Sequence, residues 1–143
     1  MEQRDYLMRQ IEQLGQVLAQ MLARLLGIKQ RGKGNIGLEE IRQTYKNELD
    51  IDLEELIKIP EYDLIAFLIG KNKNFENHFE VLADILKTTA ENYLKNNKLE
   101  EYKSLLRKSI LILEYLQTSG KDYSMDRMLK IKDYQEILKN LNL

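Results

Sequence analysis

The 143-residue sequence contains no cysteine, one histidine and one proline. Without cysteine there can be no disulfide, thiolate nucleophile or cysteine-ligated metal, and the composition fits a cytoplasmic protein. A serine–histidine–aspartate triad would have to run through His78, and one histidine cannot supply a two-histidine zinc site or the paired Glu-x-x-His motifs of a di-iron bundle. One proline and seven glycines also leave few turn signals for a β fold.

The sequence also lacks a charge excess of one sign and a long apolar run. Its 22 basic and 23 acidic residues give a net charge of −1, so no overall field attracts nucleic acid or an anionic membrane. We find no basic face, and we expect neither a nucleic-acid partner nor binding to a membrane surface. No run of about 18 apolar residues predicts a transmembrane span, and the features of a signal peptide are missing.

Abundant Leu, Lys, Glu and Gln favour helix, and the length suits one domain. We therefore expect a single all-α domain over residues 1–143, made of a long amphipathic N-terminal helix and a bundle of shorter antiparallel helices. The expected parts are the N-terminal helix at 1–28, a glycine-rich basic linker at 29–37 and the helical bundle at 38–143.

Apolar residues recur in the N-terminal helix at alternating intervals of four and three, which is a heptad pattern. We call them the seam: Leu7, Ile11, Leu14, Leu18, Met21, Leu25 and Ile28. Residues beside the seam are mostly apolar rather than charged, so the buried face is wider than one partner helix covers. The helix is expected to contact several neighbours, either from a second copy in a homo-oligomer or from the later helices of a monomer.

Small residues at Gly15, Ala19 and Ala23 form a ridge on this helix where another backbone could approach closely. Gly27 is placed to end the helix in a left-handed cap. Glycines at 32, 34 and 37 match G-x-G-x-x-G, but the phosphate-binding version of that motif needs a preceding strand. A long helix precedes it here, so we expect a linker and no cofactor.

Helix-start signals divide the remaining residues. Asp52 opens a short helix before Pro60, Asn74 is the expected N-cap of the helix that follows, and Ser124 opens the last helix. The segment Asn96–Lys98 separates two longer helices. Short loops make consecutive helices antiparallel neighbours.

The segment from Leu86 to about Ser109 resembles one tetratricopeptide repeat. The family places small, aromatic, apolar, bulky and small residues at set positions of its repeat. In the same order, these positions here hold Ala90, Tyr93, Leu99, Leu106 and Ser109. Asn97 stands where the inter-helix turn usually has glycine, whereas Tyr102 replaces an alanine and Glu114 the closing proline. The resemblance implies one helical hairpin with a peptide-contacting groove that includes Lys87, Glu91, Leu94 and Lys95.

The opening RDYLMRQIEQLGQVLAQMLARLLGIK is similar to the start of small all-helical bacterial proteins of unknown function. This similarity implies only that the first helix and the helical remainder form one unit.

The function expected from these patterns is a non-enzymatic helical interaction or scaffold protein, whose partner is itself or another helical protein. Its interaction surface would be the seam. The alternative is a module that binds a peptide or small molecule in the groove of the 75–118 hairpin. A third possibility, an enzyme, would need clustered ionisable groups in a cleft. Asp84 and Glu91 lie seven apart on one helix face, but we expect no catalytic, cofactor or metal site.

Overall fold

The computed structural model describes residues 2–31, 35–120 and 122–142. Within these ranges the chain forms helices and no β-strand, which confirms the all-α prediction. In order they are α1 (Glu2–Arg31), α2 (Asn35–Leu49), α3 (Leu53–Lys58), the 3-10 helix η1 (Glu61–Asp63), α4 (Leu64–Lys71), the 3-10 helix η2 (Lys73–His78), α5 (Phe79–Lys95), α6 (Leu99–Ser119) and α7 (Met125–Leu141).

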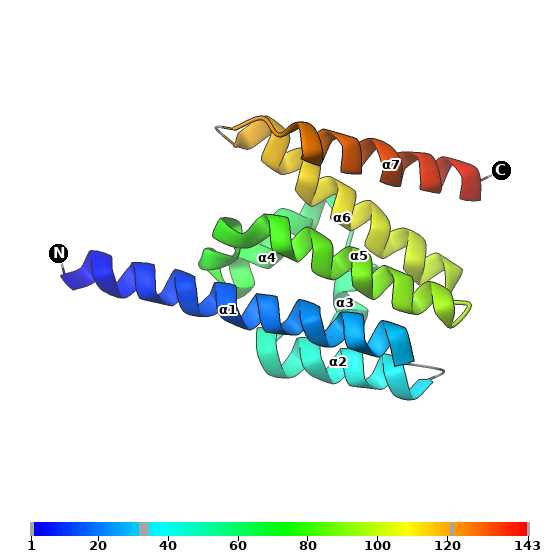
Figure 1. Ribbon diagram of the computed structural model, residues 1–143, viewed down its shortest axis with the longest axis horizontal. Helices are drawn as coiled ribbons and strands as arrows, with labels where there is room; N and C mark the ends of the chain where they lie inside the picture. The colour runs from blue at the N-terminus through cyan, green and yellow to red at the C-terminus, as the bar shows by residue number, and fades with distance from the viewer. Residues whose placement is uncertain (1, 32–34, 121, 143) are drawn as a thin grey trace.

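The antiparallel pair of α5 and α6 forms the centre of the molecule (Figure 1). The pair of α1 and α2 lies on one side of it, with α1 against α5, and α7 lies on the other side against α6. The N-terminal part of α1 extends beyond the other helices (Figure 1). The long N-terminal helix and the set of shorter helices are thus as predicted.

The α5–α6 hairpin turns where the sequence predicts it. Asn97 has a positive φ of 61°, a left-handed conformation that asparagine tolerates better than most residues. The two helices are also joined by a buried hydrogen bond, in which Ser109 Oγ donates to Ala83 O at 2.7 Å. This bond needs close helix packing, which explains the small residues at both positions.

Two of the predicted helix caps are confirmed and one is wrong. Asp52 accepts hydrogen bonds from the backbone N–H groups of Glu54 and Glu55, and Ser124 accepts one from Arg127. Asn74 is not an N-cap. Asn72 takes that role and accepts from Asn74 N at 2.9 Å, because a 3-10 turn begins at Lys73, ahead of the predicted helix start.

The predicted linker at 29–37 is wrong in most of its length, and Gly27 does not end a helix. α1 continues through Gly27 to Arg31, and α2 begins at Asn35. Residues 32–34 lie outside the described residues. A glycine inside a helix costs about 1 kcal/mol relative to alanine, and burial of Leu25 and Ile28 on either side of Gly27 offsets that cost.

One hydrophobic core unites the helices. It includes the second half of the seam, which is covered by this chain's own later helices. Its largest fully buried side chains are Tyr45, Tyr93, Phe75, Phe79, Leu18, Met21, Leu25, Ile28, Leu38, Ile41, Ile51 and Leu53.

Candidate functional site: the projecting end of α1

The seam is buried along only part of α1. Leu18, Met21, Leu25 and Ile28 are at most 1% exposed, whereas Ile11 and Leu14 are half-buried. Leu7 is 43% exposed. This chain's own helices therefore cover the seam in the second half of α1 but leave its start uncovered.

We call residues 2–10 the overhang. Three adjacent apolar side chains in it are open to solvent, with exposed fractions of 60% for Tyr6, 43% for Leu7 and 51% for Met8. Leu7 continues the line of the seam, Met8 lies beside it, and Tyr6 lies farther round the helix on the other side of Leu7. Single exposed apolar residues are ordinary, but three together at the end of a buried seam mark a surface that a partner can cover.

The small-residue ridge is used at only one position. A Cβ placed on Gly15 would lie 2.9 Å from His78 Cε1, whereas Ala19 and Ala23 are exposed. The imidazole of His78 therefore packs directly on the α1 backbone, and its Nε2 donates a hydrogen bond to Ile11 O at 2.7 Å. This contact ties η2 to α1 at the point where the overhang begins.

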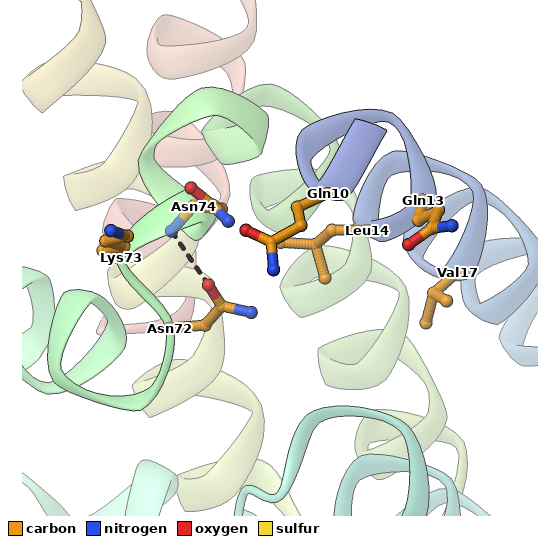
Figure 2. Close-up of a pocket in the computed structure, with 7 residues that line it drawn as sticks. All are labelled: Gln10, Gln13, Leu14, Val17, Asn72, Lys73 and Asn74. Atoms are coloured by element: carbon orange, nitrogen blue, oxygen red, sulfur yellow. Dashed lines mark hydrogen bonds between the residues drawn. The ribbon is translucent and has the colours of Figure 1, made fainter. Parts of the chain in front are cut away.

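A hollow of about 420 Å³, which we call the amide hollow, lies between α1 and the turn that starts η2. Its lining residues are Gln10, Gln13, Leu14, Val17, Asn72, Lys73 and Asn74. Figure 2 shows Gln10 and Leu14 pointing from α1 toward Asn72 and Asn74 on the facing turn. The hollow thus combines an apolar part, Leu14 and Val17, with four side-chain amides that can both donate and accept hydrogen bonds.

Sequence reasoning did not identify the amide hollow, because its two walls are about 60 residues apart in the chain. A usable signal was present in the glutamines beside the seam, since Gln10 falls at a flanking position where a coiled coil usually carries charge.

Only part of the predicted hairpin groove lines a common hollow. Lys87 and Glu91 line a second hollow, of about 390 Å³, together with residues of α1 and α7. We call it the α5 groove; its other lining residues are Leu22, Leu26, Lys29, Asp84, Thr88, Lys130 and Tyr134. Leu94 and Lys95 are not among them. Leu94 is 41% exposed, and Lys95 Nζ donates to Lys29 O instead.

Charges in the α5 groove are paired. Glu91 lies 3.1 Å from Lys29 Nζ and 3.7 Å from Lys87 Nζ, and Asp84 lies 3.3 Å from Lys130 Nζ. The Lys87 ammonium also sits 5.1 Å from the centre of the Tyr134 ring. Burial, followed by the charges of Asp84 and Glu91, raises the pKa of Tyr134 to about 12. Asp84 and Glu91 each have a cation as partner, an arrangement typical of structural ion pairs.

The described part of the chain holds no group of three or more histidine, aspartate or glutamate side chains placed to bind a metal ion. None of its helices is both long and apolar enough to cross a membrane. No family model, curated protein or solved structure matches this chain. Its function must therefore be inferred from the geometry.

Proposed function

We propose that this chain is a non-enzymatic helical interaction protein that self-associates through the overhang of α1. The observation that carries the proposal is the seam: the same apolar line that is buried in the core at Leu18 continues to an exposed Leu7. A seam of this kind is completed by another helix.

A second copy is the partner that fits this surface best. The overhang carries Glu2, Asp5, Arg4 and Arg9, two charges of each sign, so two copies meet without net repulsion. The residues that flank its seam are uncharged at Gln3, Met8 and Gln10. Like charges therefore do not face each other across the pair, and amides can bond with amides.

The copies have to pair in antiparallel orientation. In a parallel pair the two bundles would lie at the same end and compete for the face of α1 that each bundle already covers. An antiparallel pair places the bundles at opposite ends. In the heptad register, Leu7 then packs on the partner's Ile11. Across the two-fold axis, Gln10 faces the partner's Gln10 and Met8 faces the partner's Met8.

This register also gives the amide hollow an occupant. In an antiparallel pair, each residue before Leu7 lies opposite a residue after the partner's Ile11, so the overhang of one copy reaches the partner's residue 14. Arg4 would then lie opposite the partner's Leu14, where the amide oxygens of the hollow can accept from its guanidinium.

The expected affinity is modest. Burying a large apolar side chain fully contributes about 1.5–3 kcal/mol, and Tyr6, Leu7 and Met8 are about half exposed. Tyr6 lies outside the pairing face, so the Leu7 and Met8 side chains of two copies contribute about 3–6 kcal/mol, against an association cost of about 4–15 kcal/mol. The apolar patch alone gives a weak dimer, and contacts in the amide hollow must contribute for a stable one.

The absence of cysteine makes this register testable by cross-linking. We expect Gln10→Cys to give a covalent dimer with a short bis-maleimide, because the two-fold axis brings the two thiols together. Gln20→Cys is the matched control, since Gln20 is exposed on the same helix but outside the pairing region. Equal cross-linking of both variants would refute the register.

A second candidate function is binding of a peptide in the α5 groove, in line with the resemblance to a tetratricopeptide repeat. The supporting observation is that Lys87 and Glu91 line a real hollow beside Leu26, which is 42% exposed. A suitable peptide carries an apolar side chain, which would pack on Leu26, next to a carboxylate, which would bind the lysines that line the groove. Titration of peptides of this type, followed by NMR, should shift Lys87 and Leu26 resonances, and Lys87→Glu should abolish the effect. A peptide bound equally well by Lys87→Glu would place the site elsewhere.

A further inference from the structure

A buried lysine lies away from both surfaces discussed above. Lys108 of α6 is 2% exposed. Its Nζ donates to Ile57 O at 3.1 Å and to Ser104 Oγ at 2.9 Å, and Ser104 Oγ donates to Ile57 O at 2.7 Å. Ile57 belongs to the last turn of α3, so the ammonium and the hydroxyl together cap the C-terminal end of that helix.

This capping role explains the position of the ammonium but gives it no ion-pair partner. A helix C-terminus carries only a partial negative charge, about half an elementary charge even for a long helix. No carboxylate of the described residues lies within ion-pair distance of Lys108 or of its neighbour Arg107. Burial lowers the pKa of Lys108, and the nearby positive charge of Arg107 lowers it further, while Glu61 opposes these effects.

Lys108 lines a hollow of about 350 Å³, which we call the α3–α6 hollow. The residues that line it are Ile57, Ile59, Pro60, Glu61, Ser104, Arg107 and Lys108. Because Lys108 Nζ bonds to both Ile57 and Ser104, its position is fixed among three lining residues. An ammonium has three N–H donors, and two of them have the acceptors given above.

We propose that the α3–α6 hollow binds a carboxylate with a short apolar tail. The carboxylate accepts from the third Lys108 donor and from the Arg107 guanidinium, and the tail lies against Ile59 and Pro60. An anion in this position supplies the ion-pair partner that the buried ammonium otherwise lacks. The inference does not depend on self-association, because the hollow is formed by α3, η1 and α6 rather than by α1.

Glu61 determines the charge of the preferred ligand. Its carboxylate also lines the hollow, so Lys108, Arg107 and Glu61 together carry one net positive charge. A monoanion neutralises that charge, whereas a phosphate dianion overcompensates it and meets Glu61 at close range. The ligand is therefore a carboxylate, either of a free organic acid or at the C-terminus of a peptide.

We would test the site by NMR titration of the full chain with hexanoate at about pH 6, because a low pH favours the charged form of a lysine whose pKa is lowered by burial. The expected result is a saturable shift of the Lys108 and Arg107 side-chain resonances. Hexanamide is the matched neutral control and should cause no such shift. A short apolar peptide with a free C-terminus, compared with its C-terminal amide, distinguishes the two ligand sources. If hexanamide binds as well as hexanoate, or if neither carboxylate gives a saturable shift, the proposal is overturned.

Three substitutions should change the affinity for hexanoate in different directions. Arg107→Gln should weaken hexanoate binding about tenfold, the effect of losing one charge-assisted hydrogen bond. Glu61→Gln should strengthen binding severalfold, since it removes the opposing charge. Lys108→Met should abolish binding. If Lys108→Met fails to fold, the other two variants still decide, because Glu61 is exposed and Arg107 is half-buried. Unchanged affinity in both variants would refute the assignment.

Discussion

Replacing Gly15 by alanine tests how closely η2 approaches α1. In a helix interior alanine is more favourable than glycine by about 1 kcal/mol, so the substitution would stabilise an unobstructed helix. Here the new methyl group would lie 2.9 Å from His78 Cε1. The imidazole cannot move away freely, because its Nε2 is bonded to Ile11 O at 2.7 Å.

The expected net effect is destabilising. Overpacking of this kind typically costs about 1–3 kcal/mol, and loss of the His78 hydrogen bond about 1 kcal/mol. After the gain in helix propensity of about 1 kcal/mol, Gly15→Ala should lower the free energy of unfolding by about 1–3 kcal/mol. Gly27→Ala is the control in the same helix, since no atom lies within 4 Å of its new Cβ. It should raise the free energy of unfolding by about 1 kcal/mol.

Urea unfolding followed by circular dichroism measures both values. A double-mutant cycle identifies the cause: in a His78→Ala background, Gly15→Ala should become stabilising, like Gly27→Ala. If Gly15→Ala stabilises the wild-type chain as much as Gly27→Ala does, the close contact between α1 and η2 is not present in solution.

Two further predictions concern the core. Leu18→Glu should unfold the chain, because Leu18 is fully buried and an unpaired buried charge costs several kcal/mol. Ala19→Glu, on the exposed face, should change the free energy of unfolding, measured by thermal melting, by no more than about 0.5 kcal/mol. Burial, as the largest cause, raises the pKa of Tyr93 and of Tyr134 to about 12, from about 10 in the unfolded chain. Above pH ~10 the unfolded state therefore binds fewer protons than the folded state. The free energy of unfolding should keep its full value below that pH and fall as the pH rises toward 12. Tyr134→Phe should reduce the slope of stability against pH, measured by urea unfolding, and an unchanged slope would contradict the assigned burial effect.

The sequence allowed prediction of the features that depend on local pattern. The apolar period placed α1, α5 and α6, and the side chains of Asp52 and Ser124 marked helix starts because capping is decided within a few residues. Asn97 marked the hairpin turn for the same reason. These signals are short-range, so they do not depend on which helix packs on which.

The features that could not be predicted depend on tertiary packing. Gly27 has the residue type of a helix end, but burial of its neighbours keeps it inside α1. The seam pattern is as strong at Leu7 as at Leu25, yet only the later turns are covered, because the pattern does not say where the bundle stops.

The candidate sites combine elements far apart in the chain. The amide hollow joins α1 to the turn before η2, and the contact between Lys108 and Ile57 O spans 51 residues. Only a Ser-x-x-x-Lys spacing in α6 indicated that Ser104 and Lys108 would be neighbours. Nothing in the sequence placed the end of α3 beside them.

The most direct test of self-association through the overhang is the solution mass of the wild-type chain and of Leu7→Glu by light scattering, over a range of concentrations. The wild-type mass should rise toward twice the 16.9 kDa of one chain. Leu7→Glu should stay at the single-chain mass and keep its thermal stability, because Leu7 lies outside the core. A wild-type chain that remains at 16.9 kDa at every concentration, or a Leu7→Glu variant that dimerises equally well, would contradict the proposal.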